Sequence, residues 1–265
     1  MASLSTTTTQ DELEGLVATL MSQLQASPPE WLSNEEDTTN NVQDAGIPAR
    51  IDSRNLDMTM PLNGESNTPE TKTPIKYKFI LAPGNGGCGR NIKAANWYAW
   101  FDKEITKRGH ESICVNWPDP NICHQSKWIP FCINELKADE RTIIVGHSTG
   151  ALLAMRLAEQ QKVAGIILVA AAHTDLGDAG ERASGYFDEP WNWAAIPPNC
   201  NFIHQFHSVD DPLIPVAEAR FVAAQLKGEN HVYEELLQSS HFFEPWQELL
   251  DAVDRYAPSP SVPLV

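Results

Sequence analysis

Basic residues are scarce in this chain. Its 265 residues include 19 Lys and Arg against 35 Asp and Glu, which gives a formal net charge of −16 at pH 7. The phosphates of a nucleic acid have to be neutralised by Lys and Arg, so this balance argues against a nucleic-acid partner. Anionic membrane surfaces also attract basic segments, and we therefore expect no membrane partner.

The sequence also lacks paired cysteines, a signal peptide and a membrane-spanning run. Its five cysteines include no C-x-x-C pair, which predicts a reducing compartment and no disulfide framework. The N-terminus has no basic region followed by an apolar run, and Asp11, Glu12 and Glu14 are unlike the Arg-rich pattern of a transit peptide. No segment is apolar over the length that a bilayer requires. These features predict a cytoplasmic protein.

Large apolar residues are few between residues 28 and 74, where Asn, Thr, Asp, Glu and Pro dominate. Such a composition cannot bury enough surface to order the chain. Residues 10–27, in contrast, place apolar side chains on one face of a helix. We predict that residues 1–74 form an acidic, mostly disordered extension with an amphipathic helix near residues 10–27. That helix would dock on the domain, self-associate or bind a partner.

From residue 75 to residue 265 we predict one folded domain, because strand-like and helix-like patterns alternate there. The strand-like runs are 76–82, 111–117, 142–145, 163–170, 202–206 and 232–236. The helical patterns are 94–107, 126–137 with Pro130 as a start or kink, 151–159, 216–226 and 243–256. This alternation predicts an α/β fold with a mostly parallel sheet that is covered by helices on both faces.

The clearest chemical motif is Gly146-His147-Ser148-Thr149-Gly150. It lies between a β-branched apolar run and a helix-forming segment, so it fits G-x-S-x-G in the strand–turn–helix context that gives this motif its meaning. Gly146 and Gly150 have no Cβ atom, so the strand and the helix can approach each other closely. The turn would present the Ser148 hydroxyl beside the first N–H groups of the helix. The alternative is an ordinary turn in which Ser148 caps the helix.

A serine hydroxyl needs a base and a group that orients this base. In an open α/β sheet both should follow strands at their carboxyl ends. Asp210 and Asp211 follow the fifth predicted strand, and His241 follows the sixth. The order Ser148, Asp211, His241 is the one expected of an α/β-hydrolase, with His241 as base and Asp211 orienting it. We prefer Asp211 to Asp210 because D-x-x-[VI]-P, from Asp211 to Pro215, is usual after this strand in the hydrolases that the sequence resembles.

A developing oxyanion needs two N–H donors. We assign one to Thr149, which follows the nucleophile, and the other to Asn85 or Gly86 in the loop after the first strand. The same loop spells G-x-G-x-x-G with Gly84, Gly86 and Gly89, which would also suit a dinucleotide. The acidic partner for a ribose is missing near the end of the second predicted strand, so we expect no cofactor.

Two further features have a structural and a functional interpretation. His204 and His207 are a histidine pair of the kind that can suggest a metal site. An i, i+3 pair on a strand points to opposite faces, however, and no acidic third ligand is suitably spaced, so we expect no metal. Residues 175–196 interrupt the alternation and contain several aromatic residues. They would form a small lid in which Tyr186 and Trp191 line an apolar substrate pocket. The alternative is aromatic packing over the end of the sheet.

Several motifs together resemble the small serine hydrolases of the retinoblastoma-binding protein 9 family. They are PGNGG at 83–87, WPDP at 117–120, GHSTGA at 146–151, DLGDAGERASGYF at 175–187 and SVDDP at 208–212. The resemblance covers about residues 75–256 and is specific, because ERASGYF is not a general hydrolase motif. It implies a compact α/β-hydrolase with a triad at Ser148, Asp211 and His241, which cleaves esters or amides of small acyl or aminoacyl groups.

The sequence departs from this family in two places. Residues 1–74 have no counterpart, and Ala138 stands where an L-x-C-x-E motif for retinoblastoma-type pocket proteins has its cysteine. We therefore expect a small-molecule ester or amide substrate and no pocket-protein partner. The competing hypothesis is an interaction module on a hydrolase scaffold, which acts through its N-terminal helix or its acidic surface.

Overall fold

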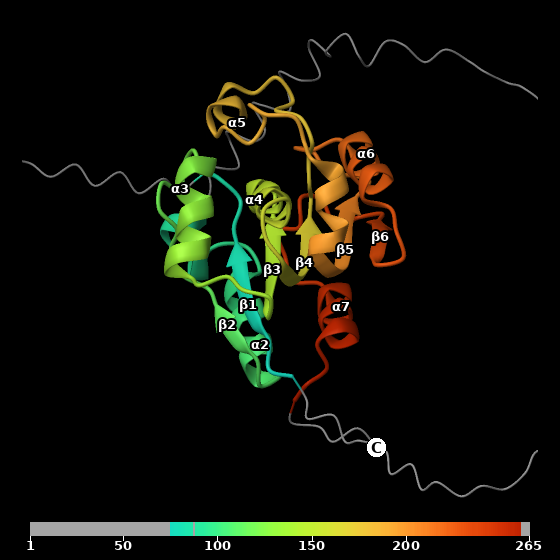
Figure 1. Ribbon diagram of the computed structural model, residues 1–265. Coiled ribbons are helices and arrows are strands. Elements are labelled where there is room, and N and C mark those ends of the chain that lie inside the picture. The colour runs from blue at the N-terminus through green and yellow to red at the C-terminus, as the bar shows by residue number, and fades with distance from the viewer. Residues whose placement is uncertain (1–74, 87, 261–265) are drawn as a thin grey trace, which may run out of the picture. The chain divides into compact units, whose positions relative to one another are not determined.

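The computed structural model describes residues 75–86 and 88–260 (Figure 1). The predicted extension of residues 1–74, with its helix near residues 10–27, lies outside the described residues. None of the helices in the described ranges is long and apolar enough to cross a membrane.

Six strands form one sheet in the order β2-β1-β3-β4-β5-β6. Every neighbouring pair is parallel, so the predicted parallel sheet is confirmed. Because β2 and β3 lie on opposite sides of β1, the winding reverses beside β1, and a crevice is expected there at the carboxyl ends of the strands. The strands are β1 Lys78–Ala82, β2 Glu111–Ile113, β3 Thr142–His147, β4 Val163–Val169, β5 Cys200–Ser208 and β6 His231–Leu236.

Helices cover both faces of this sheet, as predicted (Figure 1). The helices are α2 Tyr98–Lys107, α3 Gln125–Pro130, α4 Thr149–Ala158, α5 Ala179–Ala183, α6 Val216–Leu226 and α7 Gln247–Tyr256. An ion pair from Arg108 to Asp254 joins α2 and α7, and Tyr256 of α7 stacks on Phe202 of β5 at 3.9 Å. Gln205 of β5 points to the other face, where its Nε2 donates to a backbone carbonyl of α6 at 2.8 Å.

Two predicted helices begin later than their sequence patterns suggest. The pattern of 94–107 gives a short 3-10 turn at Ile92–Ala94 and then α2 from Tyr98, because Asn96 between them has a φ of 45°. The pattern of 243–256 gives α7 only from Gln247, since a residue that precedes a proline, here at position 245, disfavours helical backbone angles.

The predicted helix at 126–137 is divided at Pro130. The proline ends α3, and a wider turn with i to i+5 hydrogen bonds follows at Phe131–Glu135. Proline has no N–H to continue the i to i−4 ladder, so the change of helical type at this position follows from its chemistry.

Helix α4 is buried along its whole length and lies against the sheet with almost no space between the backbones. A Cβ atom added to Gly150 would lie 2.0 Å from the backbone oxygen of Ala82, and one added to Gly146 would lie 2.2 Å from the backbone oxygen of Gly150. Both contacts are with backbone atoms, which cannot rotate away. These two glycines are therefore required for the junction of β1, β3 and α4.

Replacement of Gly150 by alanine tests this close contact. Alanine normally favours a helix by about 1 kcal/mol over glycine. Here the methyl group would force α4 away from β1, and we expect Gly150→Ala to lower the free energy of unfolding by about 1–3 kcal/mol or more. The measurement is urea denaturation. Gly228→Ala is the control, because its added Cβ would make only an ordinary 3.4 Å contact; an unchanged or higher stability of Gly150→Ala would contradict the packing described here.

Candidate active site

Ser148 occupies a sharp turn between β3 and α4. Its backbone has φ 54° and ψ −120°, a conformation that residues with a side chain rarely adopt, and its N–H donates to the Val169 carbonyl at 2.8 Å. The side chain makes no capping hydrogen bond to the helix, so the alternative of a capping serine does not apply. Strained backbone of this kind persists where the surroundings hold it, and here the turn leaves the hydroxyl at the wall of a cavity.

Asp211 and His241 form a buried pair at the same end of the sheet. Asp211 Oδ2 lies 2.8 Å from His241 Nδ1, and the two side chains are 0% and 5% exposed. The other carboxylate oxygen accepts the N–H groups of Leu213 and Ile214 at 2.9 and 3.0 Å. Burial by itself would raise the pKa of Asp211, but the hydrogen bonds from His241 and from these two backbone groups outweigh it and lower the pKa. The carboxylate is therefore ionised and fixed.

Asp210 has a different role from Asp211. It accepts hydrogen bonds from the Ser208 hydroxyl and from the Ser240 N–H, the latter at 2.9 Å. Ser240 immediately precedes His241, so Asp210 holds the loop that carries the histidine and does not contact its ring. The structure thus separates the two adjacent carboxylates, one at the imidazole and one at the backbone.

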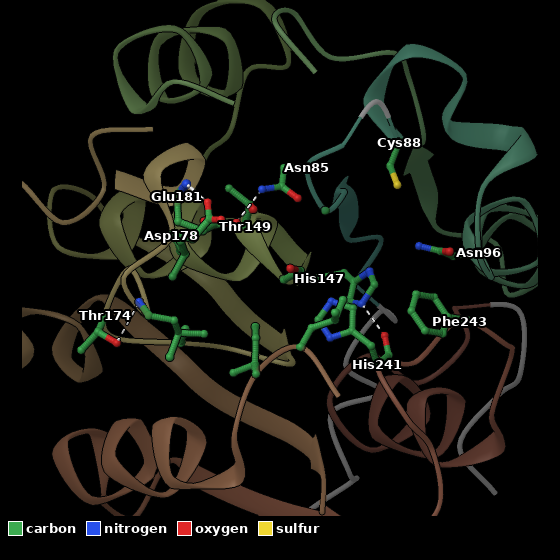
Figure 2. A pocket seen from close by; sticks show the side chains of 17 residues that line it. Asn85, Cys88, Asn96, His147, Thr149, Thr174, Asp178, Glu181, His241 and Phe243 are labelled. Carbon is green, nitrogen blue, oxygen red and sulfur yellow. Dashed lines mark hydrogen bonds between the residues drawn. The ribbon is translucent and has the colours of Figure 1, made fainter. Parts of the chain in front are cut away.

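A cavity of about 490 Å³ lies at the reversal of winding beside β1 and brings most of the predicted site together. Ser148 lines it. His241, Thr149 and Asn85 also line it (Figure 2). Thr149 is the first residue of α4, so its N–H has no acceptor within the helix. Gly86 does not line the cavity, which leaves Asn85 as the residue of this loop that faces it.

The remaining lining of the cavity is acidic on one side and apolar at the mouth. Glu181 of α5 and Asp178 both line it, and Asn85 Nδ2 donates to Glu181 Oε1 (Figure 2). Burial raises the pKa of Glu181; the hydrogen bond from Asn85 opposes this effect and the nearby Asp178 adds to it. The exposed apolar residues at the cavity are Leu176, Leu213 and Phe243. The sequence gives no signal for Glu181 and Asp178, because single acidic residues in an insertion have no characteristic spacing.

The structure corrects the prediction that Tyr186 and Trp191 line the pocket, because neither contributes to the cavity. Both are held by Arg156, a buried residue of α4. Its guanidinium donates to the Tyr186 carbonyl at 2.6 and 3.0 Å and lies 3.8 Å from the centre of the Trp191 ring. Trp191 also donates to the backbone oxygen of His173 at 2.9 Å. A buried guanidinium needs several acceptors, and the insertion supplies them, so its aromatic residues pack over the end of the sheet.

His204 and His207 have separate structural contacts. His204 Nδ1 lies 3.4 Å from the Tyr256 hydroxyl, and His207 Nε2 lies 3.0 Å from the Ile214 carbonyl oxygen. Across residues 75–86 and 88–260, no group of three His, Cys, Asp or Glu side chains is arranged to hold a metal ion.

Comparisons with known proteins show which family this chain belongs to. The model of the serine hydrolase family matches residues 79–254. The serine hydrolase RBBP9 of Rattus norvegicus is 47% identical over 150 residues, which are 56% of this chain and 80% of that protein.

Solved structures show the same fold at low sequence identity. The ydeN gene product of B. subtilis has a TM-score of 0.59 at 19% identity, covering 68% of this chain and 98% of its own. The monoacylglycerol lipase of Paleococcus ferrophilus has a TM-score of 0.53 at 16% identity, covering 71% and 96%. At such identities these two structures inform the fold alone. From the family match and the RBBP9 relative together, we conclude that this chain belongs to the serine hydrolase family and has the fold of the α/β-hydrolase superfamily.

Proposed function

We propose that this protein cleaves small esters or amides, with an acyl or aminoacyl group, through a triad of Ser148, His241 and Asp211. The observation that carries the proposal is the buried hydrogen bond from His241 to Asp211 at the wall of the cavity that Ser148 also lines. Membership of the serine hydrolase family supports hydrolase activity. The geometry of the cavity supports the choice of residues.

The proposed reaction has two stages. Ser148 Oγ attacks the carbonyl carbon while His241 Nε2 takes the hydroxyl proton, and Asp211 stabilises the imidazolium that forms. When the tetrahedral intermediate collapses, His241 gives this proton to the departing alcohol or amine, and the acyl group remains on Ser148. Water then attacks the acyl-enzyme with His241 again as base, which releases the carboxylic acid and returns the proton to Ser148.

The contact between Ser148 and His241 would close when substrate binds. In the part of the chain that the structure describes, His241 is hydrogen bonded to Asp211, and no hydrogen bond joins its ring to the Ser148 hydroxyl. Such contacts are often long in enzymes without substrate and shorten in the complex. His241 Nδ1 donates to Asp211, which leaves Nε2 as the basic nitrogen.

The oxyanion would be bound by the backbone N–H groups of Thr149 and Asn85. The Gly84 N–H is already bonded to the Tyr98 hydroxyl at 3.0 Å and is not available. Asn85 follows it in the same loop and lines the cavity. Two N–H donors that are held in place before the reaction need no reorganisation when charge develops on the oxygen.

The cavity favours aminoacyl substrates among the small esters and amides. Its volume of about 490 Å³ lies in the range of small-molecule sites. Glu181 and Asp178 give it an acidic wall near Asn85, which suits a protonated amine. The apolar mouth suits an uncharged side chain or leaving group. An interaction module on this scaffold would need neither the acidic wall nor a buried pair of Asp and His.

We also propose a cytoplasmic location and a small-molecule substrate as the principal partner. The free state of all five cysteines supports the location, since these thiols would persist in a reducing compartment.

A fluorophosphonate probe tests the nucleophile. It reacts with activated serines, so the full-length protein should be labelled, and Ser148→Ala should lose both labelling and turnover of p-nitrophenyl acetate. Ser112→Ala is the control, because Ser112 lies on β2 and its hydroxyl donates to Asp102. Absence of labelling in folded wild type, or labelling that survives Ser148→Ala, would overturn the proposal.

The two adjacent carboxylates give a second prediction. Asp211→Asn removes the charge that stabilises the imidazolium and permits the wrong tautomer, so kcat should fall by about 10⁴-fold. Asp210→Asn keeps an amide oxygen that still accepts the Ser240 N–H, and its kcat should fall far less. Steady-state kinetics of both variants, with circular dichroism to verify folding, make the comparison. Equal losses would mean that the assignment of Asp211 is wrong.

Glu181→Gln tests the preference for amines. Gln can keep the hydrogen bond to Asn85 but loses the charge, so kcat/KM for an aminoacyl ester should fall roughly 10–100-fold, the value of one charge-assisted hydrogen bond. The matched ester without the amino group should be hydrolysed as by wild type. Glu189→Gln, on the exposed part of the insertion, serves as the control variant. An equal loss for both esters would assign Glu181 a structural role only.

A further inference from the structure

Besides the candidate triad, the site contains a chain of hydrogen bonds that runs through the side chains of Tyr98 and His147. The Tyr98 hydroxyl lies 2.7 Å from His147 Nδ1. His147 Nε2 lies 2.9 Å from the backbone carbonyl oxygen of His241 (Figure 2). The same hydroxyl accepts the Gly84 N–H at 3.0 Å and the side-chain amide of Asn96 at 3.2 Å. Tyr98 is 0% exposed and His147 is 1% exposed, so water cannot replace these partners.

The chemistry of the partners fixes the hydrogens along this chain. The His241 carbonyl can only accept, so His147 Nε2 donates to it. The Tyr98 oxygen accepts two N–H groups, and its own hydrogen is therefore directed to His147 Nδ1. His147 is then the neutral tautomer with its hydrogen on Nε2. Burial, and next the neighbouring His241, lower the pKa of His147 to about 3, which keeps the ring uncharged at neutral pH.

This chain connects the three segments that carry the proposed reacting groups. Gly84 directly precedes Asn85, His147 directly precedes Ser148, and the bonded carbonyl belongs to His241 itself. The three segments are distant in sequence, because they follow three different strands, β1, β3 and β6. The ring of one histidine therefore links the loop of Asn85, the segment of Ser148 and the backbone of His241.

The backbone at His241 needs such support because both of its neighbours are strained. Ser240 has a φ of 49° and Phe242 a φ of 54°, values that residues with a side chain rarely adopt. Asp210 holds this loop from one side through the Ser240 N–H. His147 holds it from the other side, at the carbonyl of His241. Without the second contact, strain in the loop would be released by a shift of the His241 backbone.

We propose that His147 is a positioning residue, whose Nε2–H holds the backbone of His241 and whose Nδ1, through the Tyr98 hydroxyl, holds the loop of Asn85. The proposal rests on the proposed function of the triad. His147 lines the cavity, but both of its ring nitrogens are bonded to groups of the protein, so it acts through the placement of the base and of the second oxyanion donor.

Three variants separate the two ends of this chain. His147→Gln places an amide nitrogen near the position of Nε2, whereas His147→Asn places an amide oxygen near Nδ1 and cannot reach the His241 carbonyl. Tyr98→Phe removes the hydroxyl. We expect His147→Asn and Tyr98→Phe to lower kcat about 100-fold, the effect of a misplacement by about 1 Å, with little change in KM. His147→Gln should retain more of kcat than His147→Asn.

His204 and Tyr256 provide matched controls on another part of the sheet. They are also a histidine and a tyrosine hydroxyl in contact, and neither lines the cavity. His204→Asn and Tyr256→Phe should lower the melting temperature and leave kcat unchanged. If His147→Asn behaves in the same way, losing stability but keeping the kcat of wild type, His147 only fills space and the proposal is wrong.

Nuclear magnetic resonance tests the tautomer of His147 and does not depend on enzyme activity. In Ser148→Ala protein with ¹⁵N-labelled histidine, the ring nitrogens of His147 should show a protonated Nε2 and an unprotonated Nδ1 at neutral pH. The signal is assigned by its absence in the double variant with His147→Asn. A proton on Nδ1 would overturn the positioning proposal, while activity that survives Ser148→Ala would overturn the proposed function instead, so the two failures are distinct.

Discussion

The close contact of α4 with β1 and β3 is the constraint on which the candidate site depends. Gly146 and Gly150 leave no space for a Cβ atom between these backbones. The contact fixes where β3 ends and α4 begins, and so it forces Ser148 into its strained turn. It also sets the loop after β1 against Ser148, since a Cβ atom on Gly84 would lie only 3.3 Å from that of Ser148. Ser148 and the loop of Asn85 are thus positioned by one packing contact.

Much of the fold follows from local patterns in the sequence. The core strands β3 and β4 are fully buried, and a buried strand in a parallel sheet is a continuous apolar run that can be recognised without a structure. The residue types of Ser148, Asp211 and His241, their order and their positions after predicted strands predict that they lie at one edge of the sheet, because parallel strands present their carboxyl ends there. The structure places all three at that edge.

The remaining features depend on contacts between residues that are distant in sequence. From the sequence alone, an aromatic residue in an insertion can equally line a pocket or pack against the protein. Trp191 packs against the protein because its ring contacts the guanidinium of Arg156 on α4. Glu181 lines the cavity where it accepts a hydrogen bond from Asn85, a residue that lies 96 positions earlier in the sequence. Tyr98 and His147 are 49 residues apart. No periodicity or motif encodes such pairs, so they become visible only when the chain is folded.

His147 and His241 lie next to each other in this site, and they differ in their hydrogen-bond partners. The ring centres of His147 and His241 are 4.9 Å apart, so a positive charge on one would oppose a charge on the other. His147 is buried between two partners that require its neutral form, a carbonyl that only accepts and a hydroxyl that has only one hydrogen to donate. His241 instead bonds through Nδ1 to the carboxylate of Asp211, whose pKa is lowered by this bond and by two backbone N–H groups. The hydrogen-bond partners, rather than the rings themselves, therefore distinguish the two histidines, and they are the reason that we propose His241 as the base and His147 as the residue that positions it.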